Sequence, residues 1–137
     1  MKDDEMRAFA RDVFEAQPFS QFIGAELVTC GPGTTTLRLP IADHLMQQHG
    51  FVHGGAISYL ADNAITFAGG LALGGNALTS EFKINYLRPG QGEQLLARAK
   101  AKHTGKRQAV CQCEVYAVKG DAETLCALAQ GTVIAAQ

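Results

Sequence analysis

The chain has 137 residues, of which 47% are hydrophobic and 18% charged, and its formal net charge is −1. This length predicts a single domain over residues 1–137, with a core large enough to fold without disulfides. The near-neutral charge argues against nucleic acid and against an anionic membrane surface as partners.

An N-terminal helix is expected at about residues 2–16, where apolar residues recur at helical spacing between charged ones. Pro18 limits its continuation. Two short strands are expected at residues 22–30 and 34–39, because Gly31-Pro32-Gly33 between them is a strong turn signal.

A long polar loop over residues 40–53 leads into a central helix, expected from Gly54 to about residue 72. Loops of this length in small domains are often functional. No Lys, Arg or Glu occurs between Gly54 and Leu71, so the helix should be buried on most sides. A carboxylate in such a helix favours a functional site over a surface, and Asp62 is the one present.

The stripe of this helix that should lie deepest contains Ile57, Leu60, Ala64, Phe67 and Leu71. Because Asp62 and Asn63 interrupt the apolar run, we expect no segment that spans a bilayer. The acidic N-terminus also lacks the basic and apolar regions of a signal peptide. These features predict a protein with no membrane partner.

Four further strands are expected near residues 76–88, 92–104, 107–118 and 123–135. Short connections between long strands are typical of an antiparallel meander. Such a sheet has one apolar face, and covering the central helix would satisfy both elements. The sequence therefore predicts an α+β fold in which an antiparallel sheet wraps around one long central helix.

The cysteines are Cys30, Cys111, Cys113 and Cys126. Cys111 and Cys113 would share one face of a strand, and their spacing is not that of a zinc knuckle. We expect small buried side chains in a reducing compartment, and hence a cytoplasmic protein.

Two ordered blocks carry a family resemblance. The first is Gly50-Phe51-Val52-His53-Gly54-Gly55, continued by Leu60-Ala61-Asp62-Asn63, which places the acid nine residues after the histidine. The second is Thr79-Ser80-Glu81-Phe82-Lys83-Ile84-Asn85-Tyr86-Leu87-Arg88-Pro89. Over roughly residues 20–135 the chain resembles the hotdog-fold acyl-CoA thioesterases, closest to the phenylacetate-pathway (PaaI-type) group.

The resemblance implies that Asp62 acts as general base or nucleophile on a thioester and that the N–H of Gly54 polarises its carbonyl. His53 either orients the loop or carries a proton, and the former is the favoured interpretation. Gln47 stands where the family commonly has Asn, so its reach differs and Gln48 is an alternative.

In the second block the resemblance makes Thr79 a hydroxyl that positions water. Thr66 lies one helical turn after Asp62 and can hydrogen-bond to it or to a neighbouring water. Gly55, next to Gly54, is a further candidate for substrate contact. No metal or redox cofactor is implied, and His44 and His49 lack the further ligands that a zinc site needs.

Helix geometry limits which residues of one chain can contact the same substrate group. Gly54 and Asp62 are eight residues apart, or roughly 12 Å along a helix axis. Free N–H groups at a helix N-terminus stabilise developing negative charge, yet within one helix Gly54 and Asp62 cannot contact the same thioester. The smallest active unit should therefore be a homodimer with two shared sites, and the resemblance implies that a homotetramer is common.

Coenzyme A carries phosphates, and a basic cluster surrounds the turn at Gly105. The candidate phosphate ligands are Lys102, His103, Lys106, Arg107 and, beside Pro89, Arg88. An acyl pocket is expected from Leu45, Met46 and Phe51 of the loop and from the helix end near Leu71 and Leu73. An ordinary solvated turn is the alternative for the basic cluster.

The sequence thus predicts an enzyme that hydrolyses an acyl- or aryl-CoA to the free acid and coenzyme A. One alternative is a hydratase or dehydratase of acyl thioesters on the same fold. Another is a non-catalytic module that binds acyl-CoA, since fold alone does not determine function.

Overall fold

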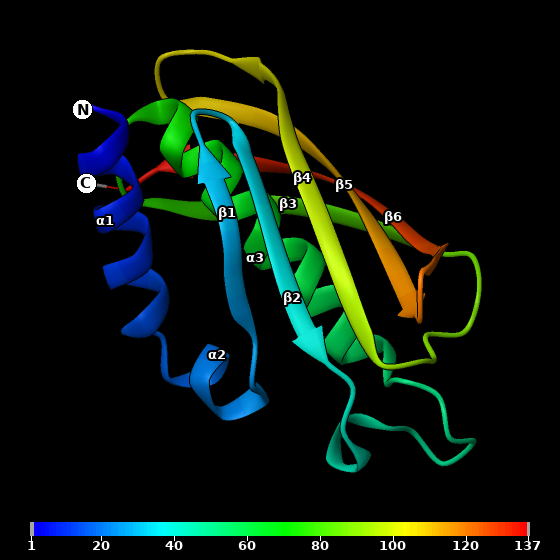
Figure 1. The fold of residues 1–137 in the computed structure, drawn as a ribbon. Helices are drawn as coiled ribbons and strands as arrows, with labels where there is room; N and C mark the ends of the chain where they lie inside the picture. The colour runs from blue at the N-terminus through cyan, green and yellow to red at the C-terminus, as the bar shows by residue number, and fades with distance from the viewer. Residues whose placement is uncertain (1, 137) are drawn as a thin grey trace.

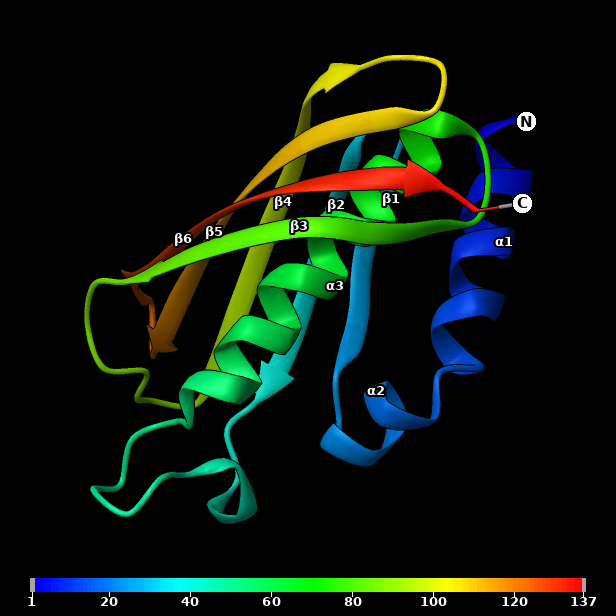
Figure 2. The ribbon, with the colours of Figure 1, turned by 180° about the vertical axis from the view of Figure 1, so that it is seen from behind.

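The computed structural model describes residues 2–136 and contains one antiparallel sheet that curves around a long helix, as expected (Figures 1 and 2). The helices are α1 (Asp3–Glu15), α2 (Pro18–Ile23) and α3 (Gly54–Leu73), with a 3-10 turn at Asp43–Leu45. The strands are β1 (Glu26–Gly31), β2 (Thr34–Pro40), β3 (Ala77–Tyr86), β4 (Gln94–Thr104), β5 (Gln108–Lys119) and β6 (Ala122–Ala135). Their order in the sheet is β1-β2-β4-β5-β6-β3.

Helix α3 forms the centre of the core. All five residues of the stripe expected to lie deepest are buried. Every strand of the sheet contacts the helix, most of all β4, β5 and β6. The helix ends at Gly74, whose φ of 92° is readily adopted only by glycine and whose N–H closes the last turn.

The expectation that no segment could span a bilayer was wrong by length and composition, since α3 meets both criteria. Its placement is that of a core helix, because most of its residues are buried inside the sheet. The two polar residues at its middle, Asp62 and Asn63, are half-buried rather than exposed.

The start of the first strand was also predicted wrongly. Residues 22 and 23 belong to α2, a six-residue helix that the sequence analysis did not foresee. Pro18 begins α2 as well as following α1. It occupies the first turn of α2, where a backbone N–H would have no helical acceptor, so the missing N–H of proline costs no hydrogen bond. Gly24 ends α2 with a φ of 84°, and β1 begins at Glu26.

The expected meander is correct only for β4, β5 and β6. Strand β3 does not pair with β4, but lies at the sheet edge beside β6, while β4 pairs with β2 (Figure 2). The connection over residues 87–93 crosses the open end of the sheet near the start of α3, where Val52 donates its N–H to the Gly90 carbonyl. One long edge of β3 is left without a strand partner among the described residues.

Three of the four cysteines, Cys111, Cys113 and Cys126, are buried in the core, and Cys30 is half-buried. Burial raises the pKa of the Cys111 and Cys126 thiols to about 11 and that of Cys113 to about 12. These thiols are therefore protonated near neutral pH and act as small apolar side chains.

Gly69 sets how closely α3 approaches the sheet. A Cβ added there would lie 2.8 Å from Cβ of Val133 and 3.2 Å from Sγ of Cys111. We expect Gly69→Ala to lower the free energy of unfolding by about 1–2 kcal/mol, because overpacking costs more than the gain of about 1 kcal/mol in helix propensity. Urea unfolding measures this difference.

The matched control is Gly75→Ala, because a Cβ at Gly75 meets no atom within 4 Å and its φ is not positive. This control should change the free energy of unfolding by no more than about 0.5 kcal/mol. Equal stability of the two variants would contradict the close packing of α3 on the sheet.

Candidate active site

Asp62 lies on the side of α3 that faces the edge strand β3. The hydroxyl of Thr79, on β3, donates to Asp62 Oδ1 at 2.6 Å. Oγ1 of Thr66, one turn along the helix, lies 2.7 Å from Thr79 Oγ1 and 3.5 Å from Asp62 Oδ1. The structure therefore brings two other predicted site residues, Thr66 and Thr79, to one carboxylate oxygen of Asp62. No donor among residues 2–136 reaches the other oxygen, Oδ2.

Thr66 also donates to the main-chain carbonyl of Asp62, at 2.8 Å. This bond is a common one for threonine in helices, where the hydroxyl bonds to the carbonyl one turn earlier. It holds the Thr66 side chain on the Asp62 side of the helix. Ser58, one turn before Asp62 on the helix, is half-buried.

The N-terminus of α3 is capped by His53. Its Nδ1 accepts the N–H of Gly55 at 2.8 Å, and its main-chain carbonyl accepts the N–H of Ala56 at 2.9 Å. The N–H of Gly54 has no acceptor among the described residues. The cap thus leaves the Gly54 N–H free at the positive end of the helix dipole, while the N–H of Gly55 is occupied.

Tyr86 packs on Gly54 and was missed as a site residue in the sequence. Its hydroxyl donates to the Gly54 carbonyl at 3.0 Å, and a Cβ added at Gly54 would lie 3.4 Å from the phenol ring. The one signal for Tyr86 in the sequence is its place in the same block as Thr79, the second of the two blocks that carry the resemblance. Tyr86 ties the N-terminus of α3 to β3.

A β-bulge lets β3 contact α3 at both ends. Thr79 pairs with Val133 and Glu81 with Thr132, so Ser80 is an extra residue in the strand. Thr79 and Tyr86 are seven residues apart and would point to opposite faces of a regular strand. With the extra residue both side chains reach α3, one at Asp62 and the other at Gly54.

Gln47 serves the loop that contains it. Its Oε1 accepts the N–H of His49 at 2.5 Å and that of Phe51 at 3.4 Å, and its main chain pairs with Phe51. Gln48 is exposed, as is His49. The structure does not bring either glutamine to Asp62 of the same chain, because both lie in the loop before the N-terminus of α3, whereas Asp62 lies two turns into the helix.

A half-buried polar network joins α2 to α3 and was not foreseen. Oγ of Ser20 lies 2.5 Å from Oη of Tyr59 and donates to Gln17 Oε1 at 2.6 Å, and Asn63 donates to the same Gln17 oxygen at 3.0 Å. Burial raises the pKa of the Tyr59 phenol, against the hydrogen bonds with Ser20 and Asn63. This network holds the residue next to Asp62.

The predicted phosphate ligands do not share one pocket. His103 lies near the end of β4, next to the β4–β5 turn that contains Lys106 and Arg107, and Arg88 lies in the loop after β3. All four side chains are exposed. Lys102, by contrast, lies on the outer face of the sheet.

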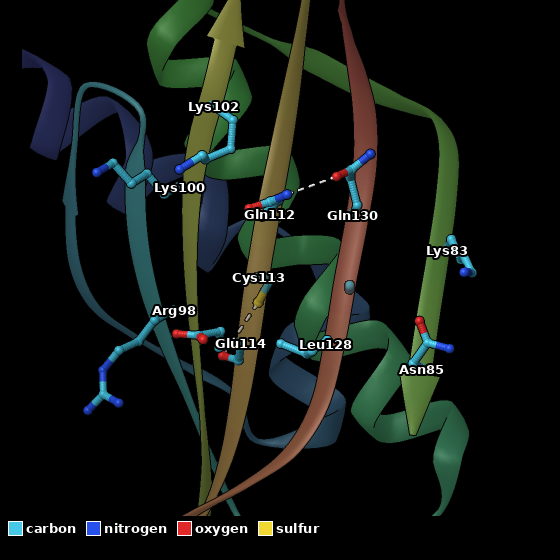
Figure 3. A pocket seen from close by; sticks show the side chains of 11 residues that line it. Lys83, Asn85, Arg98, Lys100, Lys102, Gln112, Cys113, Glu114, Leu128 and Gln130 are labelled. Atoms are coloured by element: carbon cyan, nitrogen blue, oxygen red, sulfur yellow. Dashed lines mark hydrogen bonds between the residues drawn. The ribbon is translucent and has the colours of Figure 1, made fainter. Parts of the chain in front are cut away.

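The outer face of the sheet has a hollow of about 590 Å³ on the side away from α3 (Figure 3). Lys83, Arg98, Lys100 and Lys102 bring cations to it from β3 and β4. Arg98 is bound at both guanidinium ends by Glu123, and none of the three lysines forms an ion pair within residues 2–136. This grouping leaves no local pattern in the sequence, because β3 and β4 are separated in the sheet by two other strands.

No cluster of three His, Cys, Asp or Glu side chains suited to a metal ion occurs in the part of the chain that the structure describes. Of the predicted acyl-pocket residues, Leu71 lines a small pocket beside α1, whereas Leu45, Met46 and Phe51 lie in the loop before α3.

Comparisons with known proteins agree with this arrangement. The acyl-coenzyme A thioesterase PaaI of Escherichia coli is 29% identical over 110 residues, which cover 77% of this chain and 76% of that protein. Its solved structure, at 24% identity, superposes with a TM-score of 0.89 over 98% of this chain and 96% of that one. A thioesterase family protein from Silicibacter pomeroyi gives 33% identity and a TM-score of 0.89, over 94% and 96% of the two chains. The sequence model of the thioesterase superfamily matches residues 49–124, and the chain belongs to that superfamily.

Proposed function

We propose that this protein hydrolyses acyl-CoA thioesters to a free acid and coenzyme A, with Asp62 and the Gly54 N–H as its reacting groups. The observation that carries the proposal is the Asp62 carboxylate, bound at Oδ1 by Thr79 and free at Oδ2. A carboxylate of this kind either takes a proton from water, which attacks the carbonyl, or attacks the thioester carbonyl itself. In the second case, water then hydrolyses the resulting anhydride, which releases the acid and restores the carboxylate. The name of the PaaI relative supplies the substrate class.

The Gly54 N–H is the donor proposed for the oxyanion. When the carbonyl carbon is attacked, negative charge develops on its oxygen, and the thiolate of coenzyme A leaves as the carbonyl re-forms. A fixed N–H at a helix N-terminus stabilises that charge without reorganisation. No cofactor takes part in these steps.

The free edge of β3 supports a shared site in a homodimer. Ten residues of edge strand with exposed apolar side chains, Leu78 at 61% and Tyr86 at 53%, favour pairing with a second chain. In an antiparallel pair centred between Phe82 and Lys83, Thr79 of one chain lies opposite Tyr86 of the other. Asp62 of one chain would then lie close to Gly54 of its partner, although the two residues are roughly 12 Å apart within one helix.

The exposed side chains of Arg88, His103, Lys106 and Arg107 are proposed to hold the phosphates of coenzyme A at the surface. Arginine and lysine suit phosphate, and exposed contacts of this kind are loose and weakened by salt. The substrate's reacting carbonyl, by contrast, lies between the two half-buried groups.

Loss of the carboxylate tests the role of Asp62. We expect Asp62→Ala to slow thiol release from acyl-CoA by at least about 100-fold, because a catalytic base is lost. A panel of short, medium, long and aromatic acyl-CoAs measures the rate. Asp121→Ala, at the exposed β5–β6 turn, is the matched control and should keep full activity.

Absence of thiol release from every panel member, with the thioesters still bound, would contradict hydrolysis and favour the binding module. Hydration of an unsaturated acyl-CoA without thiol release would favour the hydratase.

The variant Gly54→Pro tests the role of the Gly54 N–H as oxyanion donor. Proline lacks an N–H but suits the first position of a helix, and the ψ of 135° at His53 suits a residue that precedes proline. We expect kcat to fall by about 100- to 1,000-fold. Gly54→Ala adds a Cβ next to Tyr86 but keeps the N–H, so it should retain most activity. An equal loss in both variants would assign the effect to crowding instead.

Mixing the two inactive variants tests the shared site. In a dimer of Asp62→Ala with Gly54→Pro, one of the two sites has both groups intact. After random exchange of subunits half the dimers are mixed, so roughly a quarter of the parent activity should return. Co-refolding of equal amounts followed by the thiol assay measures it. If the mixture stays inactive while mixed dimers form, each site belongs to a single chain.

A further inference from the structure

A small pocket lies between α1 and the C-terminal half of α3. Its apolar walls come from both helices and from the segment that begins β3. The lining residues are Phe9, Val13, Gln17, Thr66, Phe67, Gly70, Leu71, Gly75, Asn76 and Ala77. No Lys, Arg, Asp, Glu or His is among them.

The pocket adjoins the carboxylate cluster of Asp62 at Thr66. Thr66 belongs to both, since it lines the pocket and its hydroxyl lies 2.7 Å from Thr79 Oγ1. Ala77 precedes Thr79 by two residues on β3, so the two side chains share the face toward α3. The pocket therefore begins on the far side of the Thr66–Thr79 hydroxyl contact from Asp62, within reach of a group that extends past these two side chains.

The acyl group of an acyl-CoA suits this pocket better than the nucleotide end does. The coenzyme carries phosphate groups, and a pocket without cationic side chains would desolvate them without compensation. An acyl group is apolar and gains from burial against Phe9, Val13 and Leu71. We propose that this pocket holds the acyl group and that α1 limits the acyl group to short chains, an inference that rests on the proposed function.

The size of the pocket sets the substrate class. Its volume is about 60 Å³, whereas an apolar cavity that binds benzene measures about 150 Å³. Acetyl to butyryl groups fill a space of this order, and a phenyl ring would extend beyond it.

The walls of the pocket do not have equal freedom to move. Phe67 is buried and packs against Phe14 with ring centroids 5.8 Å apart, so it is fixed within the core. Phe9 and Val13 are only half-buried on α1 and have no such contact from a second ring among the described residues. These two side chains therefore determine how long an acyl group can be.

The test compares the ratio of kcat/KM for hexanoyl-CoA to that for acetyl-CoA among variants. A ratio within one protein sample does not depend on the folded fraction, so partial unfolding of a variant cannot imitate the result. We expect Phe9→Ala to raise the ratio by about 10-fold or more, the range for one methylene in an apolar pocket. Val13→Phe should lower it.

The matched control is Phe22→Ala, since Phe22 is 76% exposed on α2 and does not line the pocket. Its ratio should equal that of the parent. Parent activity that is highest on long or phenylacetyl thioesters, or ratios unchanged in both α1 variants, would overturn the acyl-pocket assignment and leave hydrolysis intact. No thiol release from any thioester would overturn the proposed function itself.

Discussion

The burial of α3 inside the sheet is the interaction on which the rest of the structure depends. A helix without Lys, Arg or Glu over its first 18 residues gains little from water and is stable only when it is covered on most sides. The sheet curves around it, and Gly69 allows the approach to be close. Asp62 is thereby placed against β3, the strand with which the sheet ends, rather than against its centre.

Local periodicity explains why the sequence predicts this helix so well. The bounds of α3, its buried stripe and the Asp62–Thr66 contact all follow from spacing within one helix, which is set over a few residues. Apart from the start of β1, the strand bounds were also close, because turn residues mark them. What could not be predicted was the position of β3 beside β6, since pairing between strands distant in the chain leaves no local pattern.

The same distinction applies to the candidate site. The resemblance pointed to Asp62, Gly54 and Thr79, and the structure brings the Thr79 hydroxyl to the Asp62 carboxylate. The contact of Tyr86 with Gly54 required the bulge at Ser80, which changes the face of every residue after it and has no clear signal in sequence. The role of α2 in holding Asn63 likewise depends on side chains that meet only in the fold.

The bulge has a consequence for how the chain can vary in length. Because Thr79 and Tyr86 face α3 only through the extra residue between them, loss of one residue there would turn one of the two side chains to the outer face. The edge strand would survive as a strand, yet one end of α3 would lose its anchor. Substitutions on the outer face of β3 are therefore compatible with the site, whereas insertions and deletions within the strand are not.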